Sequence, residues 1–129
     1  MATIELTAEN FEPVMDDGGL VLVDFWAAWC GPCRMFAPVF KRASERHPDA
    51  VFGKVDTEAE PGLAAAFHIQ AIPTLAVLRD GVLIAAVPGV MPASVVDDLV
   101  ERVKALDMDE VRRSLDEAEP AASSTEEPD

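Results

Sequence analysis

Apolar residues along the chain follow two different spacings. The run 20–26 (LVLVDFW) is almost continuously apolar and rich in β-branched and aromatic residues, which is typical of a strand buried on both faces. Residues 51–55 predict a second strand of this kind. Residues 74–79 and 82–87 predict two more strands, and the Asp-Gly pair at 80–81 between them is a strong signal for a two-residue hairpin.

Helical spacing appears between these strands. Apolar residues at 35, 36, 39, 40 and 43 predict a helix that Pro48 ends. A short helix is predicted over 61–67, and a longer one with an apolar stripe on one face over 95–106. Thr7 is the candidate N-cap of a first helix, which Pro13 should shorten or distort. The alternation of strands and helices predicts an α/β sheet with helices on both faces.

The C-terminal part of the chain differs from the rest in charge. The chain has 129 residues and a net charge of −14, and residues 107–129 hold nine acidic and two basic side chains. We expect one folded domain over 1–106 and a helical extension over 107–118, where Met108, Val111 and Leu115 continue a weak apolar spacing. Residues 119–129 contain no large apolar side chain and are expected to form a disordered acidic tail.

The composition argues against several classes of partner. Nucleic acids and anionic membranes are polyanions, so a chain with 24 acidic and 10 basic residues is a poor partner for either. No apolar run reaches the roughly 18 residues of a membrane helix. The first ten residues lack the basic and apolar regions of a secretory signal. These features favour a cytoplasmic location.

The chain has two cysteines, Cys30 and Cys33, in the run WCGPC. Half of a zinc site, a structural disulfide and a redox pair are the alternatives. The spacing from Cys33 to His47 suits a zinc site, but the spacing from His47 to His68 does not. A disulfide that closes so short a loop removes little entropy from the unfolded chain. The redox pair is therefore the favoured interpretation, and no metal is expected.

Residues around the cysteines carry further candidate chemistry, each with a plainer alternative. The order strand, Cys pair, helix places Cys30 at a helix N-terminus, where unpaired N–H groups and the helix dipole favour a thiolate. Asp24 is either a proton acceptor inside an apolar strand or a surface charge at the end of a strand. Pro73 is either a functional residue or an ordinary proline at the start of a strand, and a tryptophan such as Trp29 is more often found in a core.

Several stretches resemble the thioredoxin family, and they occur in the family's order. They are VDFWAAWCGPCRMFAPVF, the Lys54-Val55-Asp56 strand, Ala71-Ile72-Pro73-Thr74, Arg79-Asp80-Gly81 and Pro88-Gly89-Val90. The FAPVF and TEAE stretches are most similar to the bacterial thioredoxin-2 branch, without the zinc-binding segment of that branch. The resemblance implies a thioredoxin fold: a central mixed β-sheet flanked by helices on both faces, here followed by the acidic tail.

The resemblance also implies a role for individual residues. Cys30 would be the exposed nucleophile and Cys33 the less exposed resolving cysteine, with Asp24 as proton acceptor and Lys54 as its partner. The Gly31-Pro32 pair resembles that of the reducing members of the superfamily. Substrates would bind at Trp29, Gly31, Pro32, Ile72, Pro73, Gly89 and Val90, with a cis bond between Ile72 and Pro73. His47 and His68 would be bystanders.

The function implied is a general protein-disulfide reductase, a thiol–disulfide oxidoreductase that works as a monomer. No bound cofactor is needed, because the two cysteines hold the electrons. NADPH would supply them indirectly through a thioredoxin reductase, so the expected partners are that reductase and disulfide-containing client proteins. The alternatives are a dedicated reductant of one partner and a binding module with a thioredoxin fold.

Overall fold

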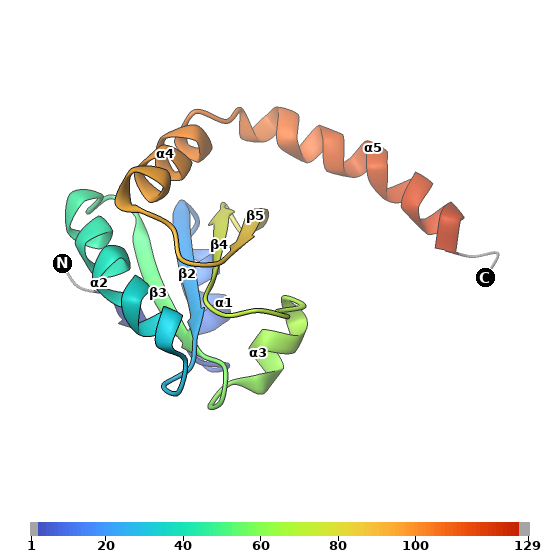
Figure 1. Ribbon diagram of the computed structural model, residues 1–129. Coiled ribbons are helices and arrows are strands. Elements are labelled where there is room, and N and C mark those ends of the chain that lie inside the picture. The colour runs from blue at the N-terminus through green and yellow to red at the C-terminus, as the bar shows by residue number, and fades with distance from the viewer. Residues whose placement is uncertain (1–2, 127–129) are drawn as a thin grey trace.

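The computed structural model describes residues 3–126, which form a five-stranded mixed sheet with helices on both faces (Figure 1). The strand order is β1-β3-β2-β4-β5, with β1, β3 and β2 parallel and β4 and β5 antiparallel to their neighbours. The elements are β1 (Ile4–Glu5), α1 (Phe11–Asp16), β2 (Leu20–Trp26), α2 (Gly31–Arg46), β3 (Val51–Asp56), α3 (Pro61–Ala66), β4 (Thr74–Arg79), β5 (Val82–Pro88), α4 (Ala93–Lys104) and α5 (Met108–Glu126).

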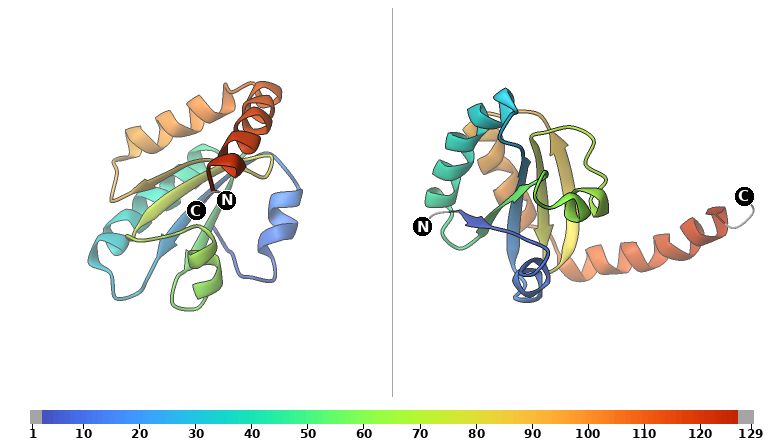
Figure 2. Two further views of the ribbon diagram at one scale, coloured as in Figure 1. Left: turned by 90° about the vertical axis from the view of Figure 1, so that its right-hand side faces the viewer. Right: turned by 90° about the horizontal axis from the view of Figure 1, so that it is seen from below.

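The central strand β2 separates two apolar clusters, because successive side chains of a strand point to opposite faces. Leu20 and Leu22 pack with residues of α2 and α4, whereas Val21, Val23 and Phe25 pack with residues of α1 and α3. Figure 2 shows α2 and α4 on one side of the sheet and α1 and α3 on the other. The prediction of a sheet covered on both faces is confirmed.

The predicted hairpin is also present. Strands β4 and β5 pair in antiparallel register, from Thr74 opposite Pro88 to Arg79 opposite Val82. Asp80 and Gly81 have φ values of 53° and 80°, so both lie in the left-handed region that a type I′ turn requires. The Asp80 carboxylate also accepts a hydrogen bond of 2.8 Å from the Gly19 N–H, which ties the turn to the start of β2.

The predicted cap of the first helix is wrong. Helix α1 starts at Phe11, its N-cap is Asn10, and Thr7 lies one turn earlier. The Thr7 hydroxyl accepts the N–H groups of Glu9 and Asn10, at 3.3 and 3.4 Å, so it caps the turn before the helix. Because the helix starts late, Pro13 falls in its first turn, where a proline is tolerated.

Arg79 holds the joint between α4 and α5. Its guanidinium donates to the carbonyls of Val103, Lys104 and Leu106, at 2.8, 3.0 and 2.8 Å. Val103 and Lys104 end α4, where carbonyls lack a partner within the helix, and Leu106 lies in the connection to α5. The apolar spacing that runs through residues 95–115 is therefore divided between two helices.

Helix α5 continues past residue 118 to Glu126, so residues 119–126 are helical where the sequence predicted a disordered tail. Figure 1 shows α5 projecting away from the sheet beyond its first turns. Pro120 lies inside the helix and supplies no N–H to it. Residues 127–129 of the expected tail lie outside the described residues.

Removal of residues 119–129 is expected to leave the melting temperature unchanged. The segment has no large apolar side chain to bury and contains Pro120, so it contributes little to the free energy of unfolding. Thermal melts of the full and shortened chains test this. A drop of several degrees, about the effect of losing 1 kcal/mol in a domain of this size, would show that the segment docks on the domain.

A methyl group at Gly53 is expected to destabilise the protein. Gly53 lies on β3, and a Cβ there would overlap the side chain of Leu6, which is fully buried. We expect Gly53→Ala to lower the free energy of unfolding by about 1–3 kcal/mol. The matched control is Gly62→Ala on α3, where a Cβ meets nothing within 4 Å. This substitution is expected to raise the free energy of unfolding by roughly 0.5–1 kcal/mol. Equal urea midpoints for the two variants would contradict the prediction.

Candidate active site

The two cysteines lie at the start of α2, immediately after the loop that leaves β2. Cys30 is the N-cap residue of α2 and Cys33 lies in its first turn. The two sulfurs form a disulfide, with the Cα atoms 5.2 Å apart. The Cys30 Sγ also accepts the N–H of Cys33, at 3.2 Å. A helix N-terminus therefore points directly at the first sulfur, as the sequence predicted.

The expectation that Cys30 is exposed is wrong for this disulfide form. The exposed fractions are 4% for Cys30 and 2% for Cys33. Both pack with Ala27, and the side chains of Trp26 and Ile72 lie against them. Cys30 is the more exposed of the two cysteines, as expected. A substrate must nevertheless approach a Cys30 sulfur that neighbouring side chains almost completely cover.

The loop before β4 lies beside the disulfide. The peptide bond between Ile72 and Pro73 is cis, as the resemblance implied. The Ile72 carbonyl oxygen is 3.7 Å from the Cys30 Sγ, and the Gly89 N–H donates to the Pro73 carbonyl at 2.8 Å. Gly89 has a φ of 98°, which a residue with a side chain rarely adopts. The structure thus places Ile72 against the Cys30 sulfur and links the loop of Ile72 and Pro73 to Gly89 at the end of β5.

Trp29 is an exposed residue, which excludes the core alternative. Its exposed fraction is 67%, and Val90 after β5 is also exposed. The Trp29 Nε1–H donates to the Glu58 carboxylate at 3.4 Å. Glu58 belongs to the TEAE stretch, but sequence reasoning missed its contact with Trp29 because the two residues lie 29 positions apart.

Asp24 is completely buried in the middle of β2. Neither of its carboxylate oxygens has a hydrogen-bond partner. It pairs in register with Lys54 on β3 and Leu75 on β4, and it shares a face of the sheet with Leu22, which α2 covers. Asp24 therefore lies on the side of the sheet from which the cysteines extend, and the surface alternative is excluded.

Burial raises the pKa of Asp24 to about 7, because the charged carboxylate loses its hydration, and the Lys54 charge partly opposes this shift. The Lys54 ammonium lies 5.1 Å from the centre of the Trp26 ring. This cation–π contact holds the lysine near the C-terminal end of β2, where the cysteine loop begins. A carboxyl group whose pKa lies near neutral pH is therefore buried on the face of the sheet that α2 covers.

The two histidines have no part in this arrangement. The His47 Nε2 lies 2.8 Å from an Asp97 Oδ1, and its ring stacks on Phe52, at the other end of α2. His68 follows α3 with a φ of 55°. Within residues 3–126 no three histidine, cysteine, aspartate or glutamate side chains are grouped to bind a metal ion. None of the helices described is long and apolar enough to cross a membrane.

Comparisons with known proteins agree on one family. The family model described as Thioredoxin matches residues 2–105. A Streptomyces coelicolor protein that carries the name thioredoxin 2 is 50% identical over 121 residues, which are 94% of this chain and 90% of the relative. This match extends beyond the residues of the family model into α5. A thioredoxin of Listeria monocytogenes is 37% identical over 99 residues, 76% of this chain and 95% of the relative.

Solved structures give the same result. A mutant thioredoxin from Halobacterium salinarum superposes with a TM-score of 0.77 at 32% identity, covering 82% of this chain and 94% of that one. The thioredoxin of Fasciola hepatica superposes with a TM-score of 0.73 at 31% identity, covering 78% and 98%.

Replacement of Asp24 by asparagine is expected to stabilise the protein in a pH-dependent way. Because the folded pKa is about 7 and the usual value is 3.8, ionisation of Asp24 opposes folding, and the parent protein loses stability as pH rises from about 4 to about 7. The asparagine does not titrate. The gain of Asp24→Asn should therefore be about 2–4 kcal/mol above pH 7 and disappear towards pH 4.

Urea unfolding of both proteins at pH 4, 6 and 8 measures this gain. The control is Asp49→Asn, because a hydrogen bond from Lys104 lowers the pKa of this exposed carboxyl. Because a lowered pKa means that the ionised form of Asp49 favours folding, Asp49→Asn should slightly lower the free energy of unfolding at neutral pH. A gain for Asp24→Asn that is the same at pH 4 and pH 8 would show that the titration of Asp24 is not its cause.

Proposed function

Because this chain belongs to the thioredoxin family and is a thiol–disulfide oxidoreductase, we propose that it reduces the disulfides of many client proteins, with Cys30 as nucleophile and Cys33 as resolving residue. The observation that carries the proposal is the Cys30–Cys33 disulfide at the N-terminus of α2. The disulfide is the oxidised form of the protein in the catalytic cycle, and the corresponding dithiol supplies two electrons.

The cycle has two exchange steps. The Cys30 thiolate attacks one sulfur of a client disulfide, so that a mixed disulfide forms and the other client sulfur leaves as a thiolate. Cys33 then loses its proton and attacks the Cys30 sulfur. The second client thiolate leaves, and the Cys30–Cys33 disulfide forms again. One client disulfide is reduced to two thiols for each pair of cysteines oxidised.

The helix supports the first step. The N–H of Cys33 lies 3.2 Å from the Cys30 sulfur, and a hydrogen bond to the charged form of a thiol favours that form. The dipole of the 16-residue helix α2 acts in the same direction.

Asp24 is the proton acceptor for the second step. Its pKa of about 7 lies close to ambient pH, which is the value that suits a general base. Its oxygens have no other partner, so they are free to receive the proton of Cys33. Lys54, whose charge lowers the pKa of Asp24, keeps part of the carboxyl ionised and ready.

The client docks on the surface around Cys30. The backbone of Ile72 offers hydrogen-bonding groups to an extended client chain, and its carbonyl already lies 3.7 Å from the Cys30 sulfur. Gly31, Pro32 and Pro73 belong to the same docking surface, and nothing lies within 4 Å of where a Cβ at Gly31 would be. Trp29, in the loop between β2 and α2, and Gly89 and Val90, between β5 and α4, complete this surface.

The electrons come from outside the chain. The two cysteines hold them without a bound cofactor, and the family implies a thioredoxin reductase that draws on NADPH. A cytoplasmic monomer is the form we propose, with the reductase and disulfide-containing clients as its partners. A coupled assay with NADPH, a thioredoxin reductase and several unrelated disulfide proteins tests this. Turnover on only one client would favour a dedicated reductant instead.

Cys33→Ser is expected to trap clients as mixed disulfides through Cys30. The variant keeps the nucleophile and lacks the sulfur that resolves the intermediate. Non-reducing gels and mass spectrometry of the adducts identify the cysteine involved. The matched control is Cys30→Ser, which should trap little, and preferential trapping through Cys33 in this control would reverse the two assignments.

Asp24→Asn is expected to slow resolution more than first attack. The loss of a well-placed general base typically costs about 10²-fold. Rapid-quench single-turnover experiments at pH 7 separate the formation of the mixed disulfide from its decay. Asp49→Asn, which changes an exposed aspartate beyond the far end of α2, serves as the control. Decay at the parent rate in Asp24→Asn would show that Cys33 gives its proton to water.

A further inference from the structure

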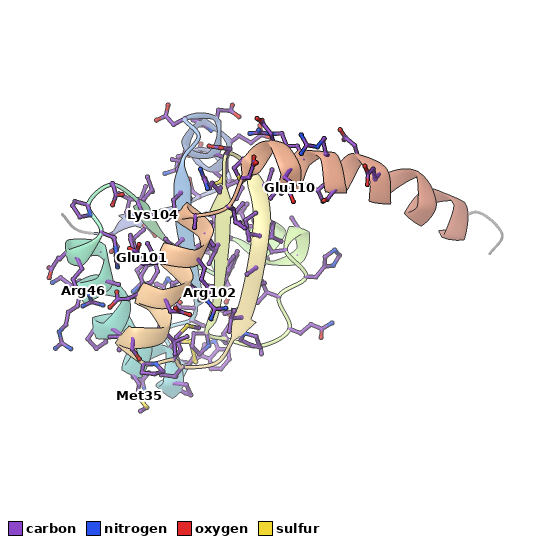
Figure 3. All side chains as sticks on the ribbon, turned by 90° about the horizontal axis from the view of Figure 1, so that it is seen from above. Met35, Arg46, Glu101, Arg102, Lys104 and Glu110 are labelled. Carbon is purple, nitrogen blue, oxygen red and sulfur yellow. A yellow bond between two sulfur atoms is a disulfide. The ribbon has the colours of Figure 1, made fainter. Side chains whose placement is uncertain are left out.

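The two most exposed large apolar side chains of the described residues flank the disulfide. Trp29 precedes Cys30 and is 67% exposed, and Met35 follows Cys33 and is 68% exposed. Trp29 belongs to the docking surface proposed above, whereas Met35 has no role assigned so far. In Figure 3, Met35 points away from the domain at the end of α2 that carries the cysteines, opposite to Arg46.

Packing does not account for Met35. The buried face of α2 is formed by Cys33, Phe36, Phe40, Ala43 and Ser44. A helix turns by about 100° per residue, so Met35 points away from the face on which Phe36 lies. Its side chain contributes to none of the three apolar clusters. An exposed apolar residue beside a reactive centre is suited to contact a partner.

A methionine suits a surface that accepts many clients. The side chain is unbranched and polarizable, so it adapts to apolar surfaces of different shape. A polar oxygen on its sulfur removes this property. The docking contribution of Met35 is therefore open to control by oxidation.

Among the described residues, Met35 is also the methionine most accessible to an oxidant. Met15, Met91 and Met108 are exposed by 9%, 5% and 6%, and Met1 lies outside the described residues. A hydroperoxide transfers one oxygen to a thioether sulfur. The O–O bond breaks, the sulfur gives up two electrons and becomes a sulfoxide, and the peroxide leaves as water or an alcohol.

We propose that Met35 is a client-docking residue and a site of oxidation by hydroperoxides, and that its sulfoxide slows the reduction of protein clients. The proposal rests on the proposed function, because it needs protein clients that dock around Cys30. It adds a residue of α2 to the docking surface and couples the activity of the protein to the peroxide that it meets.

The first experiment maps the oxidation. The full chain in its disulfide form is treated with hydrogen peroxide, quenched, digested and analysed by mass spectrometry. We expect Met35 to be oxidised at least about tenfold faster than Met15, Met91 and Met108, because those sulfurs are covered. Oxidation of any of these three as fast as Met35 would overturn the assignment of the site.

The second experiment measures docking. The Met35 sulfoxide form is reduced to the dithiol with dithiothreitol and mixed with insulin as protein client or dithiobis(nitrobenzoic acid) as small disulfide. We expect the rate constant for insulin to fall about three- to tenfold relative to that for the small disulfide, since only insulin covers Met35. Met35→Gln, which is polar and of similar length, should show the same fall without peroxide.

Two further variants complete the test. Met35→Leu should lose the response to peroxide, so that its treated and untreated samples reduce insulin equally. Leu83→Gln changes an exposed apolar residue at the far end of β5 and should not alter the insulin rate constant. Parent rate constants for both the sulfoxide form and Met35→Gln would overturn the docking role. If the untreated parent reduces neither disulfide, the proposed function itself has failed.

Discussion

The burial of strand β2 on both faces is the constraint on which the site depends. Its hydrogen-bonded partners β3 and β4 fix where neighbouring residues lie: Lys54 comes beside Asp24, and Thr74, immediately after Pro73, comes beside Phe25. A one-residue slip would turn every side chain of β2 to the opposite face, so the apolar clusters hold this register. The cysteine loop leaves the end of the same strand. The register that forms the core therefore also assembles the active site.

Asp24 is the residue at which stability and function conflict. An apolar side chain at this position would complete a strand that is otherwise apolar and buried. The carboxyl group has no hydrogen bond, and burial raises its pKa to about 7 although the charge of Lys54 opposes the shift. Such a residue opposes folding at neutral pH, and proteins keep local violations of this kind mainly at functional sites. This conflict is the physical argument for the proposal that Asp24 acts in the exchange.

The sequence predicted most of this arrangement, because strong local signals agreed with one another. The continuous apolar run, the Asp-Gly hairpin and the Cys pair before a helix are all short-range patterns, and each appears in the structure. Two local expectations differ from the structure, because Asn10 and not Thr7 caps α1 and because residues 119–126 are helical. What the sequence missed otherwise concerns contacts between distant residues. Arg79 ends α4 by binding three carbonyls more than 20 positions away, and Glu58 reaches Trp29 across 29 positions. The cover of Cys30 by Ile72 likewise depends on how the loops meet.

The chemistry of the thiol alone explains little of the rate of such an exchange. For a thiol whose pKa lies above ambient pH, each unit by which the pKa falls raises the thiolate fraction about tenfold but lowers its nucleophilicity about threefold. The net gain is only about threefold per unit. The remainder has to come from the orientation of the client disulfide over a sulfur that is 4% exposed. Orientation requires contacts beyond the sulfur, and we propose that the Ile72 backbone and the exposed apolar side chains of Trp29 and Met35 provide them. On this proposal, the selectivity of the protein for its clients resides in this surface more than in the cysteine pair.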